Sequence, residues 1–406
     1  MRKPLEGIKV LDLTTFVAAP VCGRLLADLG AQVIKVERPE GDGWREFGVG
    51  FNPRFSEDQN PIYDIYNSGK KGIALNLKDP DAKEIFWKLL EQSDVFLTNT
   101  RPEALNRLGF GHEAVRARCP RLIYAIVLGF GETGPEAARP AFDTTAFWAR
   151  SGFLRDMAPL TESYMPISPP SGVGDTVTAY NLLAEINAAL YAREKTGKGD
   201  YVRASLYHTG IFTMGCMEIA AQRPWGRVYP QTRKQVGPPG GCYMCADGEW
   251  LFLANGQQSV SVPRMFRLIG RPELIEDPRF STAQARRENK DELYEIFKAA
   301  YLTKTCQEWL DLTVELDLPA VRMNHFGDVP EDEQAWACGY LERMTCPDGE
   351  TVVMPSSPIH MDAVGELKTE PAPYVGQDTR EVLCELGYSE DEIAALQDKG
   401  AVRCRK

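Results

Sequence analysis

Asp175 is the residue whose type and surroundings best suit covalent chemistry. It follows Gly174, and Leu182, Leu183 and Ile186 then continue an apolar pattern at helical spacing. We expect Asp175 at the start of a helix, where free N–H groups and the helix dipole keep its carboxylate ionised and oriented. Such a carboxylate is suited to act as a nucleophile. Because aspartate is also a common helix cap, this local pattern taken alone favours a structural role.

Sequence motifs for other kinds of catalysis or for metal binding are absent or incomplete. The sequence has no GxxxxGK[ST] phosphate loop, no HExxH and no GxSxG. His208 stands alone in a predicted helix, and we interpret it as a packed or solvated side chain. Cys242 and Cys245 have the spacing of metal ligands, but no second pair completes a zinc site. We therefore expect no metal.

Basic residues recur at the ends of predicted strands. Ligands of open parallel sheets bind beyond the carboxyl ends of the strands, so these cations favour an anion with several phosphates. The alternative is ordinary solvated surface charge. The residues are Arg38, Lys70, Lys71, Lys78, Arg101 and Arg107.

The elements that must position these residues alternate between strand and helix over the first two hundred residues. Strand patterns at 7–13 and 31–37 flank a helical pattern at 19–29, which forms a βαβ unit of a parallel sheet. Further strands are predicted at 73–77, 95–98 and 122–128, and further helices at 80–91, 142–151 and 175–193. The first turn reads TTFVAAP in place of GxGxxG, so we reject binding of NAD or FAD.

The composition changes after residue 223. We expect an α/β large domain from 1–223, a proline-rich and glycine-rich linker at 224–241, and a small domain at 242–325. Residues 326–406 follow the small domain. A hairpin is predicted at 242–254, helices at 260–269, 292–301 and 306–316, and a strand at 320–323. The tail has a second hairpin about 347–349 and helices at 379–386 and 389–399.

Composition excludes several classes of protein. The chain has 406 residues with 43% hydrophobic and 25% charged residues, typical of a globular protein with two domains. A net charge of −11 argues against nucleic-acid binding. No segment has the pattern of a membrane helix or a signal peptide, and the 10 cysteines are scattered. We expect a cytoplasmic protein with reduced thiols.

Several blocks, in order over nearly the whole chain, resemble the class III CoA-transferases. These blocks include PLEGIKVLDLT, GAQVIKVERPEGD, LNLKDPDAK, REKTGKGDYVRASL and LGYSEDEI. GVGDTVTA matches the segment that carries the nucleophilic aspartate of that family, which is Asp175 here. YNSGKKGIALNLK, RPAFDTTAFWARSG and PEDEQAW are most similar to the cinnamoyl-CoA:phenyllactate branch.

The resemblance implies a mechanism and a set of CoA contacts. Asp175 would attack an acyl-CoA to form a mixed anhydride and then an aspartyl-CoA thioester, without a metal. An incoming carboxylate would leave as the new acyl-CoA. The expected contacts to CoA or the reacting groups are Val17, Ala18, Arg38, Leu75, Asn76, Lys78, Asn99, Thr100, Arg101, Arg107, Phe142 and Asp143.

The resemblance also implies the fold and the substrates. The family fold is a Rossmann-like parallel-sheet domain with a smaller α+β domain, in an interlocked homodimer. The resemblance implies that residues 326–406 form a return linker and the C-terminal part of the large domain. The formyl-CoA branch has a glycine-rich lid, whereas this chain reads VGPPGGCYMCADG there. We therefore expect aryl or branched 2-hydroxy acids and their enoyl-CoA counterparts in place of oxalate. Four aromatic residues could line an apolar pocket for them, namely Phe16, Phe142, Phe147 and Trp148. The alternative is that they are ordinary core aromatics, which applies at least equally to Phe147 and Trp148. The alternatives are an acyl-CoA racemase of related fold and a non-catalytic CoA-binding protein.

Overall fold

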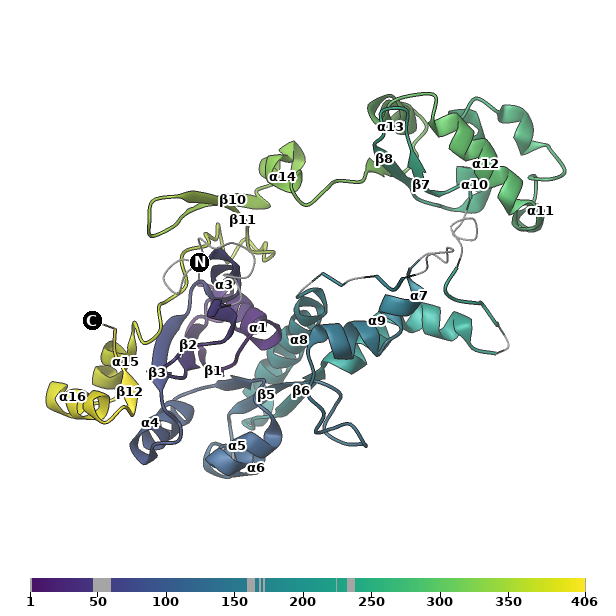
Figure 1. Cartoon of the computed structure of the whole chain (residues 1–406). Coiled ribbons are helices and arrows are strands. Elements are labelled where there is room, and N and C mark those ends of the chain that lie inside the picture. The colour runs from purple at the N-terminus through teal and green to yellow at the C-terminus, as the bar shows by residue number, and fades with distance from the viewer. Residues whose placement is uncertain are drawn as a thin grey trace. The chain divides into compact units, whose positions relative to one another are not determined.

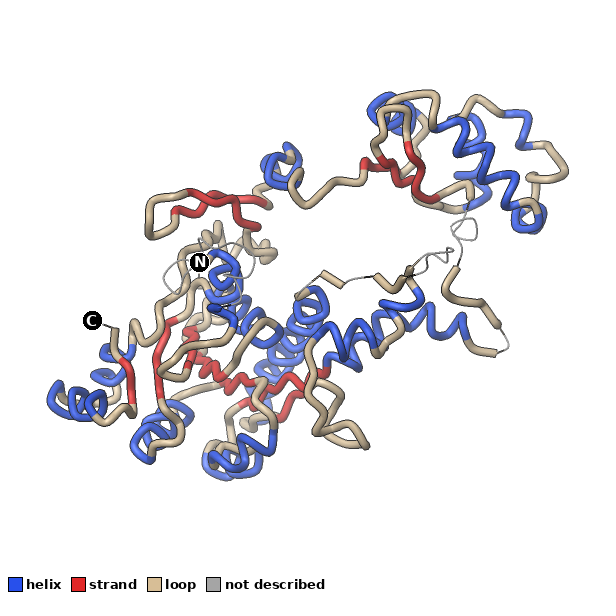
Figure 2. Tube along the Cα trace, viewed as in Figure 1, coloured by secondary structure: helices blue, strands red, loops and turns tan. Residues whose placement is uncertain are grey.

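The computed structural model describes residues 2–46, 60–158, 165–167, 169–170, 172–223, 225–231 and 238–405. The chain divides into two compact units. The first comprises residues 1–153, 169–219 and 330–406, and the second comprises 154–168 and 220–329. Part of the expected linker, residues 224 and 232–237, lies outside the described residues. Figure 1 labels the elements, and Figure 2 shows helices and strands along the chain.

A seven-stranded sheet forms the centre of the first unit, in the order β12-β3-β2-β1-β4-β5-β6. Six strands are parallel and β12 pairs with β3 in antiparallel register. The order reverses between β1 and β4, which is where ligands bind in doubly wound sheets. The strands are β1 Lys9–Leu13, β2 Gln32–Glu37, β3 Lys71–Leu75, β4 Val95–Thr98, β5 Ile123–Leu128, β6 Tyr201–Ser205 and β12 Val402–Arg403.

Helices cover both faces of this sheet (Figure 1). On one face, α4 and the C-terminal helices bury Phe86, Leu89 and Val382 against the strands in one apolar core. On the other face, α1 packs against α8. The helices of the first unit are α1 Ala18–Asp28, α3 Pro61–Asn67, α4 Pro80–Glu91, α5 Pro102–Leu108, α6 His112–Arg118, α8 Val173–Thr196, α9 Leu206–Ala221, α14 Glu333–Ala337, α15 Thr379–Glu385 and α16 Glu390–Asp398, whereas α7 Phe153–Asp156 lies mainly in the second unit.

Three local elements complete the first unit. The predicted helix at 142–151 is a shorter π-helix over Thr144–Ala149. The predicted hairpin in the tail is β10 Leu341–Thr345 paired with β11 Thr351–Pro355. A one-turn 3-10 helix spans Val329–Glu331.

The second unit has its own sheet and core. The predicted hairpin is present as β7 Gly241–Met244 and β8 Trp250–Leu253, and β9 Ala320–Arg322 adds the third strand. Its core includes Tyr243, Phe266, Phe297 and Trp309. The surrounding helices are α10 Gln258–Leu268, a 3-10 helix Pro272–Ile275, α11 Ala283–Glu288, α12 Lys290–Tyr301 and α13 Cys306–Glu315.

Candidate active site

A groove of about 540 Å³ lies at the carboxyl ends of β1, β2, β3 and β4. Thr14 and Thr15 line it after β1, the segment 36–42 after β2, the segment 75–78 after β3, and Thr100 after β4. Short polar side chains and backbone groups therefore surround the point where the strand order reverses. This is the location at which a doubly wound sheet binds an extended nucleotide ligand.

The groove brings together five of the twelve residues expected to contact CoA or the reacting groups. These are Arg38, Leu75, Asn76, Lys78 and Thr100. The side chains of Arg38 and Lys78 are exposed, so their charges are available to an anion. Asn99 holds the neighbouring loop, since its amide contacts the backbone of Thr15 through both its oxygen (3.0 Å) and its nitrogen (2.7 Å). The remaining residues do not line the groove. They are Val17, Ala18, Arg101, Arg107, Phe142 and Asp143.

Two of the basic residues noted in the sequence are committed to other contacts. Lys70 is buried, and its Nζ lies 2.9 Å from Asp12 Oδ2, from the carbonyl of Pro20 and from Asn67 Oδ1. Lys71 forms ion pairs with Glu381 and Glu385 of α15. The interpretation of these two lysines as part of an anion-binding rim is therefore wrong. Lys70 precedes β3 and Lys71 is its first residue, so the backbone of both lies at the amino end of this strand, away from the groove.

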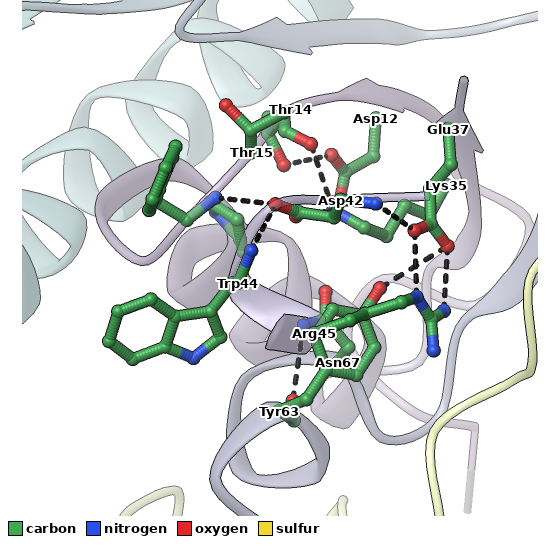
Figure 3. Close-up of polar contacts among 12 residues, drawn as sticks. Asp12, Thr14, Thr15, Lys35, Glu37, Asp42, Trp44, Arg45, Tyr63 and Asn67 are labelled. Atoms are coloured by element: carbon green, nitrogen blue, oxygen red, sulfur yellow. Dashed lines mark hydrogen bonds and ion pairs between the residues drawn. The ribbon is translucent and has the colours of Figure 1, made fainter. Parts of the chain in front are cut away.

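A network of buried charges supports the groove (Figure 3). Lys35 Nζ lies 3.2 Å from Asp42 Oδ2 and donates a 2.9 Å hydrogen bond to the carbonyl of Thr14. Glu37 receives two hydrogen bonds from Arg45, of 2.8 and 2.7 Å. Burial by itself would lower the pKa of Lys35, but the carboxylates around it outweigh burial and raise that pKa. The network thus remains charged and fixes the loop after β1.

The loop after β1 has a strained residue at its centre. Phe16 has a φ of 63°, which is uncommon for a residue with a side chain. Its N–H donates to Asp42 Oδ1 at 3.1 Å, and Asp42 Oδ1 also accepts from the N–H of Trp44 at 3.0 Å. The Phe16 ring meets the ring of Phe142 edge-on at a centroid distance of 5.3 Å. Asp42 therefore links the groove, which it lines, to the aromatic pair formed by Phe16 and Phe142. In the sequence, the one indication of this role is that Asp42 follows β2.

Asp175 lies in the first turn of α8, as its glycine-rich approach predicts. The helix begins after Gly172, which has a φ of 84° and so favours glycine. Gly174 is required for packing, because a Cβ atom there would lie 2.5 Å from the ring of Phe147. Phe147 is buried beneath the turn that carries Asp175. These contacts fix the start of α8 and the direction of its first side chains.

At the start of α8, the carboxylate that accepts a hydrogen bond from the backbone is that of Asp143, although we expected Asp175 to interact with these N–H groups. The Asp143 carboxylate, which is 4% exposed, accepts a hydrogen bond of 3.2 Å from the N–H of Gly172. Burial raises the pKa of Asp143, and backbone N–H groups, including those of Gly172 and Gly174, offset part of this rise. A residue 29 positions away along the chain therefore caps this helix. The sequence offered no local signal for this contact.

The carboxyl group of Asp175 is consequently not held ionised. Burial raises the pKa of Asp175 from 3.8 to about 7, and the nearby charge of Asp143 adds to the rise. The expectation of a carboxylate kept ionised by the helix dipole is therefore wrong. At neutral pH the group divides between a neutral acid and a desolvated carboxylate, and a desolvated carboxylate is a stronger nucleophile than a hydrated one.

Tyr66 lies close to Asp175, and sequence analysis did not predict this. Its hydroxyl lies 3.2 Å from the position that a Cβ atom on Gly172 would occupy, and Val17 lies 3.5 Å from the same position. Burial raises the pKa of Tyr66, and Asp175 and Asp143 raise it further. The Tyr66 phenol therefore stays protonated and can donate a hydrogen bond near the carboxyl group of Asp175. Val17 ends the loop after β1, whose residues Thr14 and Thr15 line the groove, so this loop extends from the groove to the start of α8.

The other candidates lie outside this arrangement. His208 is exposed on α9. Cys245 is buried in the second unit and hydrogen-bonds to Cys306. Within the residues that the structure describes, no group of three or more His, Cys, Asp or Glu side chains could hold a metal ion. In the same part of the chain, no helix is both long and apolar enough to cross a membrane.

Comparison with known proteins places this site in a family. The model of CoA-transferase family III matches residues 5–379. The (R)-2-hydroxy-4-methylpentanoate CoA-transferase of Clostridioides difficile is 38% identical over 98% of this chain and 99% of its own length. The cinnamoyl-CoA:phenyllactate CoA-transferase of Clostridium sporogenes is 35% identical over 99% of this chain and 98% of its own.

Solved structures agree with this assignment. Rv3272 from Mycobacterium tuberculosis has a TM-score of 0.81 at 28% identity and covers 94% of this chain and 99% of its own. A CaiB/BaiF family protein from Brucella suis has a TM-score of 0.77 at 26% identity and covers 95% of this chain and 100% of its own. The chain therefore belongs to CoA-transferase family III, and it is an enzyme of the class III CoA-transferase type.

Proposed function

We propose that this enzyme transfers CoA through covalent intermediates on Asp175. One observation carries the proposal. The carboxyl group of Asp175 lies in the first turn of α8 with its pKa raised to about 7, beside the loop that borders the groove. A carboxyl group removed from water beside a second carboxylate is costly to maintain, and such groups cluster at functional sites.

The proposed reaction passes through an anhydride, an aspartyl-CoA thioester and a second anhydride. An Asp175 carboxylate oxygen bonds to the thioester carbonyl carbon of the donor, the C–S bond breaks, and CoA leaves as its thiolate. The thiolate then attacks the aspartyl carbonyl carbon of the anhydride, which releases the donor acid as a carboxylate. The acceptor carboxylate attacks the aspartyl thioester, and the released thiolate finally attacks the acceptor's acyl carbon, which regenerates Asp175. No redox partner is required.

We propose that the groove holds the phosphate-bearing part of CoA. Arg38 and Lys78 supply exposed cations, and Thr15 and Thr100 supply hydroxyl and backbone groups at the carboxyl ends of the strands. Under this proposal, Arg101, which immediately precedes α5, and Arg107, which lies in its last turn, extend the same basic surface. The proposed contacts of Val17 and Ala18 are through their backbone at the start of α1, because both side chains are buried.

We propose aryl or branched 2-hydroxy acids and their enoyl-CoA counterparts as substrates. The names of the two bacterial relatives contain one branched and one aryl 2-hydroxy acid. The edge-on pair of Phe16 and Phe142 supports an apolar wall, since Phe142 is 57% exposed and so available to a ligand. Such a wall distinguishes acids by about 1–3 kcal/mol per methylene, so several related acids should react.

We propose that the active form is an interlocked homodimer. The sequence of α9 is apolar on all sides, yet Phe212 is 84% exposed and Ile219 is 55% exposed. A helix that is apolar all round is normally buried, so these residues favour coverage by a second copy of the chain. Sedimentation should then show a dimer that dilution does not dissociate. A folded monomer would contradict the interlocked arrangement.

The deciding experiment is chemical trapping during turnover. The protein is incubated with a donor acyl-CoA and treated with hydroxylamine or borohydride, and the modified residue is located by peptide mass spectrometry. We expect modification at Asp175, no CoA exchange in Asp175→Ala, and wild-type exchange in Glu194→Gln, which alters an exposed carboxylate on the same helix. Labelling of another carboxylate would refute the mechanism. Exchange of the α-proton of acyl-CoA with solvent, without CoA transfer, would indicate a racemase instead.

A further inference from the structure

The second unit contains a cavity of about 610 Å³ with strongly basic walls. Its lining includes Arg227, Arg286, Arg287 and Lys290, together with neutral polar side chains such as Gln258. No carboxylate is among the described residues that line it. This concentration of positive charge contrasts with the net charge of −11 of the chain. The cavity lies within the range of about 300–1,000 Å³ that is typical of small-molecule sites.

The four cations have no ion pair with any carboxylate of the described residues, whereas several other cations of the same unit do. Arg286 donates to the carbonyl of Phe280 at 2.8 Å and to Gln258 Oε1 at 3.1 Å, and both acceptors are neutral. Arg227 donates to the neutral side-chain oxygen of Gln231 at 2.9 Å. By contrast, three of the four arginines between residues 260 and 280 pair with aspartate or glutamate. These are Arg264, Arg271 and Arg279.

Without an anion, repulsion among the four cations of the cavity destabilises the folded chain. Burial lowers the pKa of Arg286, and the adjacent charge of Arg287 lowers it further. Both causes disfavour the charged guanidinium, which arginine nevertheless retains at every physiological pH. Like charges that converge on one cavity destabilise the folded chain unless an anion offsets their repulsion. Placing several cations together without a carboxylate is therefore typical of an anion-binding site.

We propose that this cavity binds a small organic or inorganic anion with two or more negative charges, such as a phosphate ester. Guanidinium groups bind phosphate or carboxylate oxygens through paired, charge-assisted hydrogen bonds. Gln258 is the first residue of the 11-residue helix α10, so the positive end of the helix dipole adds to the field there. The site does not involve Asp175, and its test is independent of the covalent mechanism.

The test uses inorganic pyrophosphate as the probe and the full-length protein at low ionic strength. Calorimetric titrations are run with and without saturating CoA, so that the groove of the first unit is blocked in one arm. We expect saturable binding in both arms. The double variant Arg287→Gln/Lys290→Gln should raise the Kd at least tenfold, which corresponds to about 1.4 kcal/mol. The control Arg271→Gln/Lys298→Gln removes the same charge outside the cavity and should leave the Kd unchanged.

Stability separates a binding role from a structural one. Because Arg287 and Lys290 repel other cations, their replacement should leave the free energy of unfolding unchanged or raise it in the absence of anion. If the double variant also weakens CoA binding, the anion is a phosphate of CoA itself. If CoA binding is unchanged, the anion is a separate ligand. Absence of saturable binding in the arm without CoA, an unchanged Kd in the cavity variant, or loss of stability in that variant would each overturn the proposal. Loss of pyrophosphate binding only when CoA is bound, together with weaker CoA binding by the double variant, would identify CoA as the source of the anion.

Discussion

Replacing Asp175 with asparagine should stabilise the protein at neutral and alkaline pH. Asparagine has nearly the same shape as aspartate but carries no charge. The folded state raises the pKa of Asp175 from 3.8 to about 7, so it resists ionisation of this group. Between these two pH values the folded state binds more protons than the unfolded state, and the stability of the wild type therefore falls as the pH rises. The variant has no proton to lose and avoids this penalty.

The size of the effect follows from the pKa. One pH unit of pKa difference corresponds to about 1.36 kcal/mol, so a rise to about 7 sets an upper limit of about 4 kcal/mol above pH 7. The Asp175 side chain is half-buried, and solvent screening reduces this limit. We expect a gain in the free energy of unfolding of roughly 2–4 kcal/mol at pH 8 and close to zero near pH 4.

The assay is urea unfolding followed by circular dichroism at several pH values between 4 and 8. Wild type and Asp175→Asn are compared at equal protein concentration, because association also contributes to stability. Glu194→Gln is the matched control, since its side chain is 72% exposed on the same helix and should show no pH-dependent difference. A stability difference between wild type and Asp175→Asn that does not change with pH would refute the proposed desolvation of this carboxyl group.

Three further variants test the surroundings of Asp175. Asp143→Asn removes a charge that raises the pKa of Asp175, so the rise of kcat/KM with pH should move to lower pH; an unmoved profile would exclude this coupling. Gly174→Ala places a Cβ atom 2.5 Å from a buried phenyl ring and should cost roughly 1–3 kcal/mol of stability in urea, and unchanged stability would contradict the packing. Asp42→Asn should lower kcat more than it changes KM for acyl-CoA, whereas Glu40→Gln, on the same groove, should leave kcat unchanged; equal kcat values would remove the positioning role of Asp42.

Much of the secondary structure could be predicted from local sequence patterns. Alternating apolar strands and amphipathic helices predicted the parallel sheet, and both hairpins lie where turn residues interrupt strand patterns. The short strand β12 was not predicted, because its two residues carry no periodicity and pair only through contact with β3. The π-helix at Thr144–Ala149 likewise differs from the predicted α-helix.

For the site, the sequence by itself determined that Asp175 begins a helix, because the glycines before it and the helical spacing after it act over a few residues. Only the tertiary structure decided the protonation of Asp175, since its pKa depends on burial and on Asp143 from a distant segment. The same holds for Lys70, which resembles a surface lysine in sequence but is buried against Asp12. Local pattern specifies backbone conformation, whereas the charge state of a side chain depends on which remote groups exclude water from it.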